Sequence, residues 1–110
     1  MHIEPTEKEL RFIEAYFEAM YFTNQEDFEA YDICEDYERE QVIECLAFYT
    51  RVSCLLSDDN IEQAGHDFWM SRNGHGVGFW DRPDSVYIPH IRDILENHAQ
   101  KFGNTDVIAY

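Results

Sequence analysis

Two histidines and two aspartates lie within residues 65–82, the segment of the chain best suited to chemistry. His66, Asp67, His75 and Asp81 are residue types that serve as general acids and bases or bind metal ions. The eight residues between His66 and His75 match no standard zinc signature. Neighbouring side chains on a helix point about 100° apart, so His66 and Asp67 do not readily face one site. We therefore expect a structural role for these residues, with no catalytic site, metal or cofactor.

The aromatic residues of the same segment predict a buried junction between a helix and a β-hairpin. The four side chains that would fill it are Phe68, Trp69, Phe79 and Trp80. His66 and Asp81 would hydrogen-bond inside this junction, because buried polar groups need partners. Arg72 and Arg82 would pair with Asp67, Asp81 or carboxylates of a helix predicted at residues 36–56. The residues assigned to this structural motif are His66, Phe68, Trp69, Arg72, Gly74, His75, Gly76, Gly78, Phe79, Trp80 and Asp81.

Three glycines alternate at Gly74, Gly76 and Gly78, a spacing also found in phosphate-binding loops. A nucleotide-binding loop follows a strand and opens a helix, whereas these glycines follow a helix and lead into a predicted strand at residues 77–81. No lysine follows them, and an acidic chain disfavours phosphate. The glycines therefore indicate a tight turn with close backbone approach.

The spacing of apolar residues predicts four helices that position this segment. Their expected ranges are residues 6–22, 36–56, 58–71 and 89–102. Thr6 and Glu9 form a capping box at the first helix, and Ser57 is a good N-cap for the third. Pro89 suits the first turn of the last helix, and Gly103 suits the position after its end.

Two short segments, residues 77–81 and residues 107–110, are predicted strands that would pair with each other. The expected fold class is therefore α+β, with about four helices closed by a small C-terminal antiparallel β-hairpin. The 110 residues fit a single domain, residues 1–110, that is able to bury a modest core.

Three cysteines, Cys34, Cys45 and Cys54, form an odd and sparse set, unlike the paired cysteines of a secreted disulfide scaffold. Cys45 and Cys54 fall in a helical pattern and are expected in the core. No apolar run approaches the length of a membrane span, and the first residues lack the pattern of a signal peptide. The sequence therefore predicts a cytoplasmic protein in a reducing compartment.

The chain is strongly acidic, with 23 Asp and Glu against 8 Lys and Arg and a formal net charge of -15. This charge repels nucleic acid and anionic membranes, so we expect neither as a direct partner. Residues 1–60 hold 16 acids and 4 bases, a net of -12, whereas residues 61–110 hold 7 acids and 4 bases, a net of -3. The acids expected to contact a basic partner are those of the densest stretch: Glu26, Asp27, Glu29, Asp32, Glu35, Asp36, Glu38, Glu40 and Glu44.

Residues 65–82 closely resemble a motif, roughly A-G-H-D-F-W-L-x-R-N-G-H-G-x-G-F-W-D-R, in small acidic proteins encoded by bacteriophages and plasmids. The similarity extends to residues 12–22, 45–48 and 101–107, and so covers nearly the whole chain. Met70 stands where leucine is more usual in the motif, which is a conservative change in packing. The resemblance implies a mobile-element origin and a bacterial host cell. It implies no reaction, because the group as a whole has no established activity.

Three classes of function are consistent with these observations. The first is an inhibitor or modulator that occupies a host nucleic-acid-handling protein, such as a restriction enzyme, CRISPR effector, nuclease, repair enzyme or polymerase. Its carboxylates would imitate a phosphate backbone and steer association. The second is an adaptor or accessory protein without catalytic activity, whose acidity serves only solubility. The third is an enzyme or metal protein that uses His66, Asp67, His75 and Asp81. We expect the first class, with a host protein that has a basic surface as the partner and no enzymatic activity.

Overall fold

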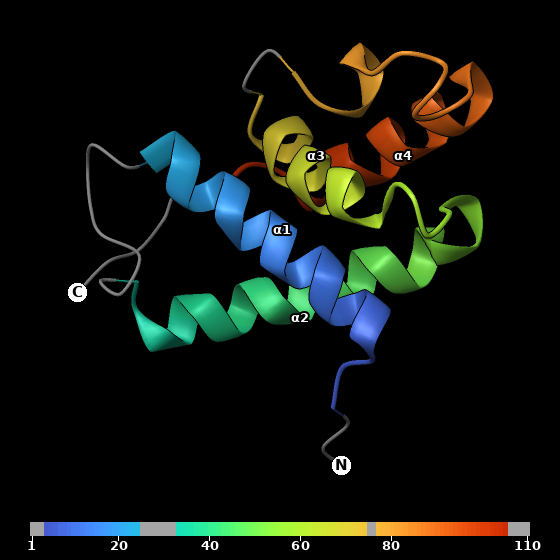
Figure 1. Ribbon diagram of the computed structural model, residues 1–110. Coiled ribbons are helices and arrows are strands. Elements are labelled where there is room, and N and C mark those ends of the chain that lie inside the picture. Colours follow the sequence, from blue (N-terminus) through green and yellow to red (C-terminus); the bar gives the residue numbers. More distant parts are fainter. Residues whose placement is uncertain (1–3, 25–32, 75–76, 106–110) are drawn as a thin grey trace.

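The computed structural model describes residues 4–24, 33–74 and 77–105, and this part of the chain is predominantly helical (Figure 1). Within it the α-helices are α1 (Glu7–Asn24), α2 (Glu35–Val52), α3 (Ile61–Asn73) and α4 (Pro89–Phe102). Two short 3-10 helices, η2 (Ser53–Leu55) and η3 (Phe79–Asp81), come after α2 and α3. None of the helices in these ranges combines the length and the apolar character needed to cross a membrane.

The predicted α+β fold is wrong, because the described residues contain no strand or sheet and the fold is all-α. The predicted strand at residues 77–81 is replaced by η3, and its predicted partner at residues 107–110 lies outside the described residues. The backbone of Gly78 (φ 151°) passes so close to α3 that a Cβ there would lie 2.1 Å from Ser71 Oγ. The Phe79 amide donates a hydrogen bond of 3.0 Å to the same oxygen. The backbone of residues 78–79 is therefore packed against and hydrogen-bonded to a side chain of α3, and not to a neighbouring strand.

Three of the predicted helix ends agree with their capping signals. The Thr6 amide donates to Glu9 Oε1 at 2.7 Å, and the Glu9 amide donates to Thr6 Oγ1 at 3.2 Å, which confirms the capping box. α4 has its predicted bounds, with Pro89 at its start and Gly103 (φ 72°) after its end. Short-range chemistry is sufficient to place these three helix ends.

The start of α3 differs from the prediction. Residues 58–60 form a turn, and the helix begins at Ile61 without Ser57 as its N-cap. Asn60 explains the delay, because its Oδ1 accepts a hydrogen bond from the Ser57 amide at 2.9 Å. Its Nδ2 donates to the Val86 carbonyl at 3.1 Å, which ties the turn to the segment before α4. α2 likewise ends earlier than predicted, and η2 takes up the next turn.

α1 lies across the middle of the fold, with α2 on one side and α3 on the other (Figure 1). It packs tightly on α3 at Gly65, where a Cβ would lie 2.2 Å from the Phe12 carbonyl oxygen and 3.1 Å from Ala15 Cβ. A side chain at this position would collide with backbone, so glycine is required there. Small residues therefore set the spacing of the largest helix–helix contact in the fold.

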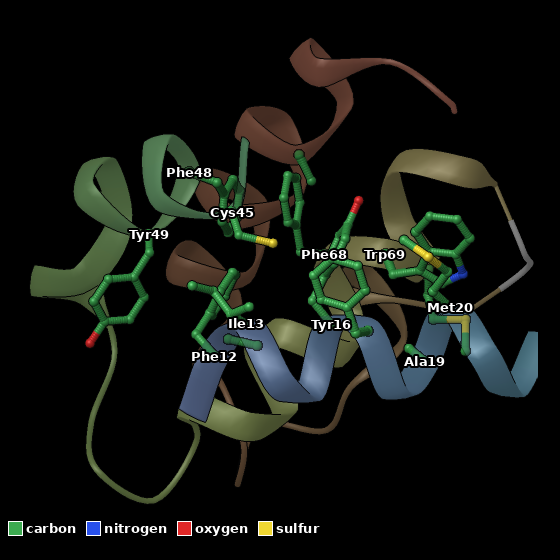
Figure 2. Close-up of a cluster of buried hydrophobic side chains, with 14 of the residues drawn as sticks. Phe12, Ile13, Tyr16, Ala19, Met20, Cys45, Phe48, Tyr49, Phe68 and Trp69 are labelled. Atoms are coloured by element: carbon green, nitrogen blue, oxygen red, sulfur yellow. The ribbon is translucent and has the colours of Figure 1, made fainter. Parts of the chain in front are cut away.

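Aromatic side chains of α1, α2 and α3 pack together in the core (Figure 2). Phe79 of η3 is buried in the same core, and the partly buried Phe102 of α4 packs against it. Phe68 of α3 stacks on Phe48 of α2 with ring centroids 4.1 Å apart, and the Tyr16 ring of α1 lies 5.2 Å from Phe68. The predicted burial of Cys45 in this core is confirmed. The predicted burial of Cys54 is wrong, because Cys54 lies in η2, where the chain has left the helical pattern of α2 and the side chain is exposed.

Candidate functional site

Five of the nine acids predicted to contact a partner lie on α2. The other four fall outside the described residues; they are Glu26, Asp27, Glu29 and Asp32. Four of the five on α2 have exposed side chains and lie in the first two turns of the helix. These four form what we call the acidic end of α2: Glu35, Asp36, Glu38 and Glu40.

Glu44, the fifth acid on α2, pairs with a buried arginine and serves the fold. Its Oε1 lies 2.7 Å from Nη2 of Arg72, whose side chain is 2% exposed. Arg72 also donates to the carbonyls of Phe102 and Gly103 at 3.1 and 2.8 Å, and it lies over the Phe68 ring. A buried cation that loses its partner is strongly destabilising, so Glu44 is committed to this contact. We therefore remove Glu44 from the set of residues expected to bind a partner.

The acidic end of α2 covers two sides of the helix. Asp36 and Glu40 are four residues apart and share one row along the helix surface. Glu35 and Glu38 are three residues apart and share a second row on another side. Arg39 is the single base among residues 35–40, and it pairs with Asp36 at 3.1 Å between exposed side chains. The surface is therefore broader than one stripe and keeps a net negative charge.

Most basic side chains of the described residues are engaged in ion pairs with other acids of the fold. These pairs are Lys8–Asp58 (2.8 Å), Arg11–Glu62 (2.6 Å), Arg72–Glu44 (2.7 Å), Arg82–Asp67 (2.8 Å) and Arg92–Asp84 (3.1 Å). These five basic side chains therefore pair with acids that do not belong to the acidic end of α2. Arg39, which pairs with Asp36, is the base within residues 35–40.

The aromatic residues of the segment 65–82 belong largely to the core. Phe68, Trp69 and Phe79 are buried, which confirms their predicted place. Trp80 is 53% exposed, so its predicted burial is wrong. Trp80 follows Phe79 in η3, where successive side chains point about 120° apart. When Phe79 enters the core, Trp80 must therefore turn toward solvent.

Asp67, and not Asp81, is the buried acid of this segment. The Asp67 side chain is fully buried, and its carboxylate accepts hydrogen bonds of 2.8–3.2 Å from three side chains: Arg82, Tyr87 and Gln63. Asp81 is exposed, so its predicted hydrogen bond inside the junction is wrong. Arg82 pairs with Asp67, which is one of the partners predicted for it. The hydrogen bond from Tyr87 to Asp67 could not be predicted from the sequence, because the two residues are 20 positions apart and meet only where the chain after η3 returns to α3.

The two histidines of the segment make no described site together. The buried Nδ1 of His66 has no hydrogen-bond partner within the described residues and lies 3.9 Å from Asp67 Oδ1. His75 and Gly76 fall outside the described residues, and Gly74 (φ 65°) ends α3. In the part of the chain that the structure describes, no three His, Cys, Asp or Glu side chains are placed to hold a metal ion.

An open groove of about 400 Å³ lies between α1 and α3. Its charged and titratable lining residues are Arg11, Glu14, Glu18, Glu62, His66 and Arg82. No sequence pattern joined these residues, because they are far apart along the chain and meet only where α1 packs on α3 at Gly65. The groove is therefore a feature that sequence reasoning missed.

Two features of the described residues are suited to binding, the acidic end of α2 and the groove between α1 and α3. Comparisons with protein-family models, with curated proteins and with solved structures find no match to this chain. The function is therefore inferred from the chemistry of these two surfaces.

Buried phenols and a buried thiol make the fold sensitive to alkaline pH. Burial raises the pKa of Tyr16, of Tyr87 and of the Cys45 thiol. In the unfolded chain these groups ionise near their ordinary values, about 8.5 for Cys and about 10 for Tyr. The stability that depends on keeping them neutral is therefore complete below about pH 8.5 and falls as the pH rises toward their raised folded values.

We expect the melting temperature, followed by circular dichroism, to be level near pH 7–8 and to fall progressively above about pH 8.5. Cys45→Ala removes the group that titrates first and should make the fall between about pH 8.5 and 10 shallower. A melting temperature that stays constant to about pH 10.5 would show that these groups do not couple to folding.

Proposed function

We propose that this chain is a small acidic binding protein of a phage or plasmid that inhibits or modulates a host nucleic-acid-handling protein. The proposed contact surface is the acidic end of α2. The observation that carries this proposal is the presence of four exposed carboxylates against one base within residues 35–40. The resemblance of residues 65–82 to a motif of phage and plasmid proteins supports the mobile-element origin.

The charge density of this surface is close to that of a nucleic-acid strand. Residues 35–40 carry four acids and one base, a net of -3, and six helical residues span about 9 Å at 1.5 Å per residue. This is one net negative charge per about 3 Å, against one phosphate per about 3.4 Å along a DNA strand. A basic surface that has evolved to bind phosphates would therefore attract the acidic end of α2.

The partner implied by this surface is a protein with exposed Lys and Arg residues, in the cytoplasm of a bacterial host. Long-range attraction would speed the encounter of the two proteins and would orient the acidic end toward the basic site. Occupation of that site would exclude nucleic acid and so inhibit or modulate the partner. An adaptor whose acidity serves solubility alone would show no such dependence on a particular set of acids.

Neutralising the acidic end of α2 is expected to weaken binding at least tenfold. The variant carries Glu35→Gln, Asp36→Asn, Glu38→Gln and Glu40→Gln. Exposed ion pairs contribute up to about 1 kcal/mol each, and about 1.4 kcal/mol is tenfold in Kd. The partner is captured from a bacterial lysate at low salt, identified by mass spectrometry and purified, and its Kd for both proteins is then measured. DNA should compete with the wild-type chain for the same partner.

The matched control removes four exposed acids elsewhere, with Glu4→Gln, Asp59→Asn, Asp81→Asn and Asp93→Asn. It changes the net charge by the same amount and should leave Kd within about threefold, since distant exposed charges are screened beyond roughly 10 Å at 0.1 M salt. Association of the wild-type chain should slow as salt rises, while dissociation changes less. Binding that is indifferent to salt and equal for both variants would support the adaptor instead.

A further inference from the structure

The groove between α1 and α3 is large enough to hold a ligand or a long side chain. Its volume of about 400 Å³ falls within the range of small-molecule pockets, roughly 300–1,000 Å³. Ala15 lines the groove where α1 meets Gly65, so the tight helix contact forms part of its boundary. The walls are polar: α1 contributes Glu14 and Glu18, and α3 contributes His66. Such a groove suits a charged occupant better than an apolar one.

The two arginines of the groove already have carboxylate partners. Arg11 donates to both oxygens of Glu62, at 2.6 and 2.9 Å, and its Nη2 also donates to the Asp58 carbonyl. The hydrogen bond from Arg11 lowers the pKa of Glu62, so both members of the pair stay charged at neutral pH. Arg82 donates to both oxygens of the buried Asp67 carboxylate. The charges of both arginines are therefore already balanced by carboxylates, so an anion in the groove would gain little binding free energy from them.

Two carboxylates of the groove, those of Glu14 and Glu18, have no such partner. Both side chains are exposed, and no ion pair joins either of them to a base within the described residues. They lie four residues apart on α1, which places their Cβ atoms about 5–6 Å apart. Two carboxylates at this spacing can both accept hydrogen bonds from one guanidinium, whose planar fork presents several N–H donors. The negative charges of Glu14 and Glu18 therefore favour a cation as the occupant of the groove.

His66 distinguishes an arginine from other cations. Its ring borders the groove, with 35% of the side chain exposed, while its Nδ1 is buried 3.9 Å from Asp67 Oδ1. The Nδ1 edge of the imidazole thus lies beside Asp67, and the side chain is part of the groove lining. A guanidinium stacks on aromatic rings, whereas an ammonium is a compact and strongly hydrated charge. An arginine can therefore contact the ring and the carboxylates together.

We propose that the groove between α1 and α3 binds an arginine side chain presented by a partner protein. The carboxylates of Glu14 and Glu18 accept hydrogen bonds from the guanidinium, and the His66 ring supports its flat face. This site uses α1 and α3, whereas the proposed contact surface for a nucleic-acid-handling protein is on α2. The arginine site therefore goes beyond that proposed function, and either one can fail while the other stands.

The test is a titration of the whole chain with a capped Gly-Arg-Gly peptide, followed by NMR. The His66 side-chain resonances should shift and saturate. A matched peptide with citrulline in place of arginine keeps the shape and loses the charge, and it should bind at least tenfold more weakly. A lysine peptide should also bind more weakly than the arginine peptide. Equal binding of the citrulline or lysine peptide, or no saturable shift, would overturn the proposal.

Matched variants locate the binding. Glu14→Gln with Glu18→Gln should weaken the arginine peptide at least tenfold, and both positions are exposed, so the melting temperature should be unchanged. Glu4→Gln with Asp93→Asn changes the net charge equally at two exposed acids that lie neither in the groove nor on the acidic end of α2, and it should leave the affinity within about twofold. Equal losses in the two double variants would mean general attraction to an acidic chain and would overturn the site. Tighter binding of free L-arginine than of the capped peptide would assign the groove to a small molecule and would overturn the protein partner.

Discussion

Replacing Phe68 by alanine is expected to lower the free energy of unfolding by about 3–5 kcal/mol. Phe68 is fully buried and stacks on Phe48, and Phe12 and Tyr16 of α1 lie against the same ring (Figure 2). The truncation would open a cavity where α1, α2 and α3 meet, and the surrounding aromatic rings cannot all collapse into it. The guanidinium of Arg72, 5.3 Å from the ring centroid, would lose its cation–π contact as well. Urea denaturation of both proteins gives the difference directly.

Trp80 provides a matched control from the same aromatic segment. Its side chain is half exposed and buries only part of its apolar surface, so Trp80→Ala should lower the free energy of unfolding by clearly less than Phe68→Ala does. If both side chains filled the buried junction, as the sequence predicts, the two truncations would cost similar amounts, whereas the structure predicts a clear difference. Comparable destabilisation by both substitutions would contradict the inward position of Phe79 and the outward position of Trp80 in η3.

Signals that act over a few residues predicted the helices well. The reciprocal hydrogen bonds of Thr6 and Glu9 involve only one turn, so the sequence is sufficient to place the start of α1. Pro89 and Gly103 mark the ends of α4 for the same local reason. The turn before α3 combines a local hydrogen bond, from the Ser57 amide to Asn60, with a distant one from Asn60 to the Val86 carbonyl 26 positions away, and only the distant bond is hidden from the sequence. Distant hydrogen bonds of this kind leave no periodic pattern to read.

The hairpin was predicted wrongly because glycine and aromatic residues serve a strand and a packed turn equally well. The conformation of residues 77–81 depends on Ser71. Its Oγ accepts a hydrogen bond from the Phe79 amide and lies so close to Gly78 that no side chain would fit there. Ser71 is itself held by a hydrogen bond to Glu96 of α4 at 2.7 Å. The structure of this segment is thus set by two helices that pack against it, and propensity gives way to tertiary contacts.

The two candidate binding surfaces differ in how far the sequence predicts them. An acidic run at the start of an amphipathic helix is expected to be exposed, and the acidic end of α2 is exposed. The loss of Glu44 from that set depends on the burial of Arg72, which is 28 positions away. The groove depends on Gly65 bringing α3 against α1, so its carboxylates on α1 and its histidine on α3 share no sequence neighbourhood. Packing, and not composition, creates that site.

Asp67→Asn is expected to destabilise the fold by about 3–5 kcal/mol, the usual cost of removing one partner from a buried ion pair. Asp67 is fully buried and accepts hydrogen bonds from Arg82, Tyr87 and Gln63. Asparagine has the same size, but its amide nitrogen is a donor that would face other donors. The Arg82 side chain, 23% exposed, would keep its charge without its carboxylate, and the network that joins α3 to the segment before α4 would break.

A double-mutant cycle separates the ion pair from simple loss of packing. Asp67→Asn combined with Arg82→Met should lose less free energy of unfolding than the two single variants together, because the second change removes the unpaired cation. Asp81→Asn, at an exposed aspartate of the same segment, should stay within about 0.5 kcal/mol of the wild type. Additive losses across the cycle would mean that Asp67 acts through Tyr87 and Gln63 and not through Arg82. The Arg82 side chain is 23% exposed, so its guanidinium could turn to water once the carboxylate is gone. An Asp67→Asn variant as stable as the wild type would show that it does so, and would contradict the expected loss.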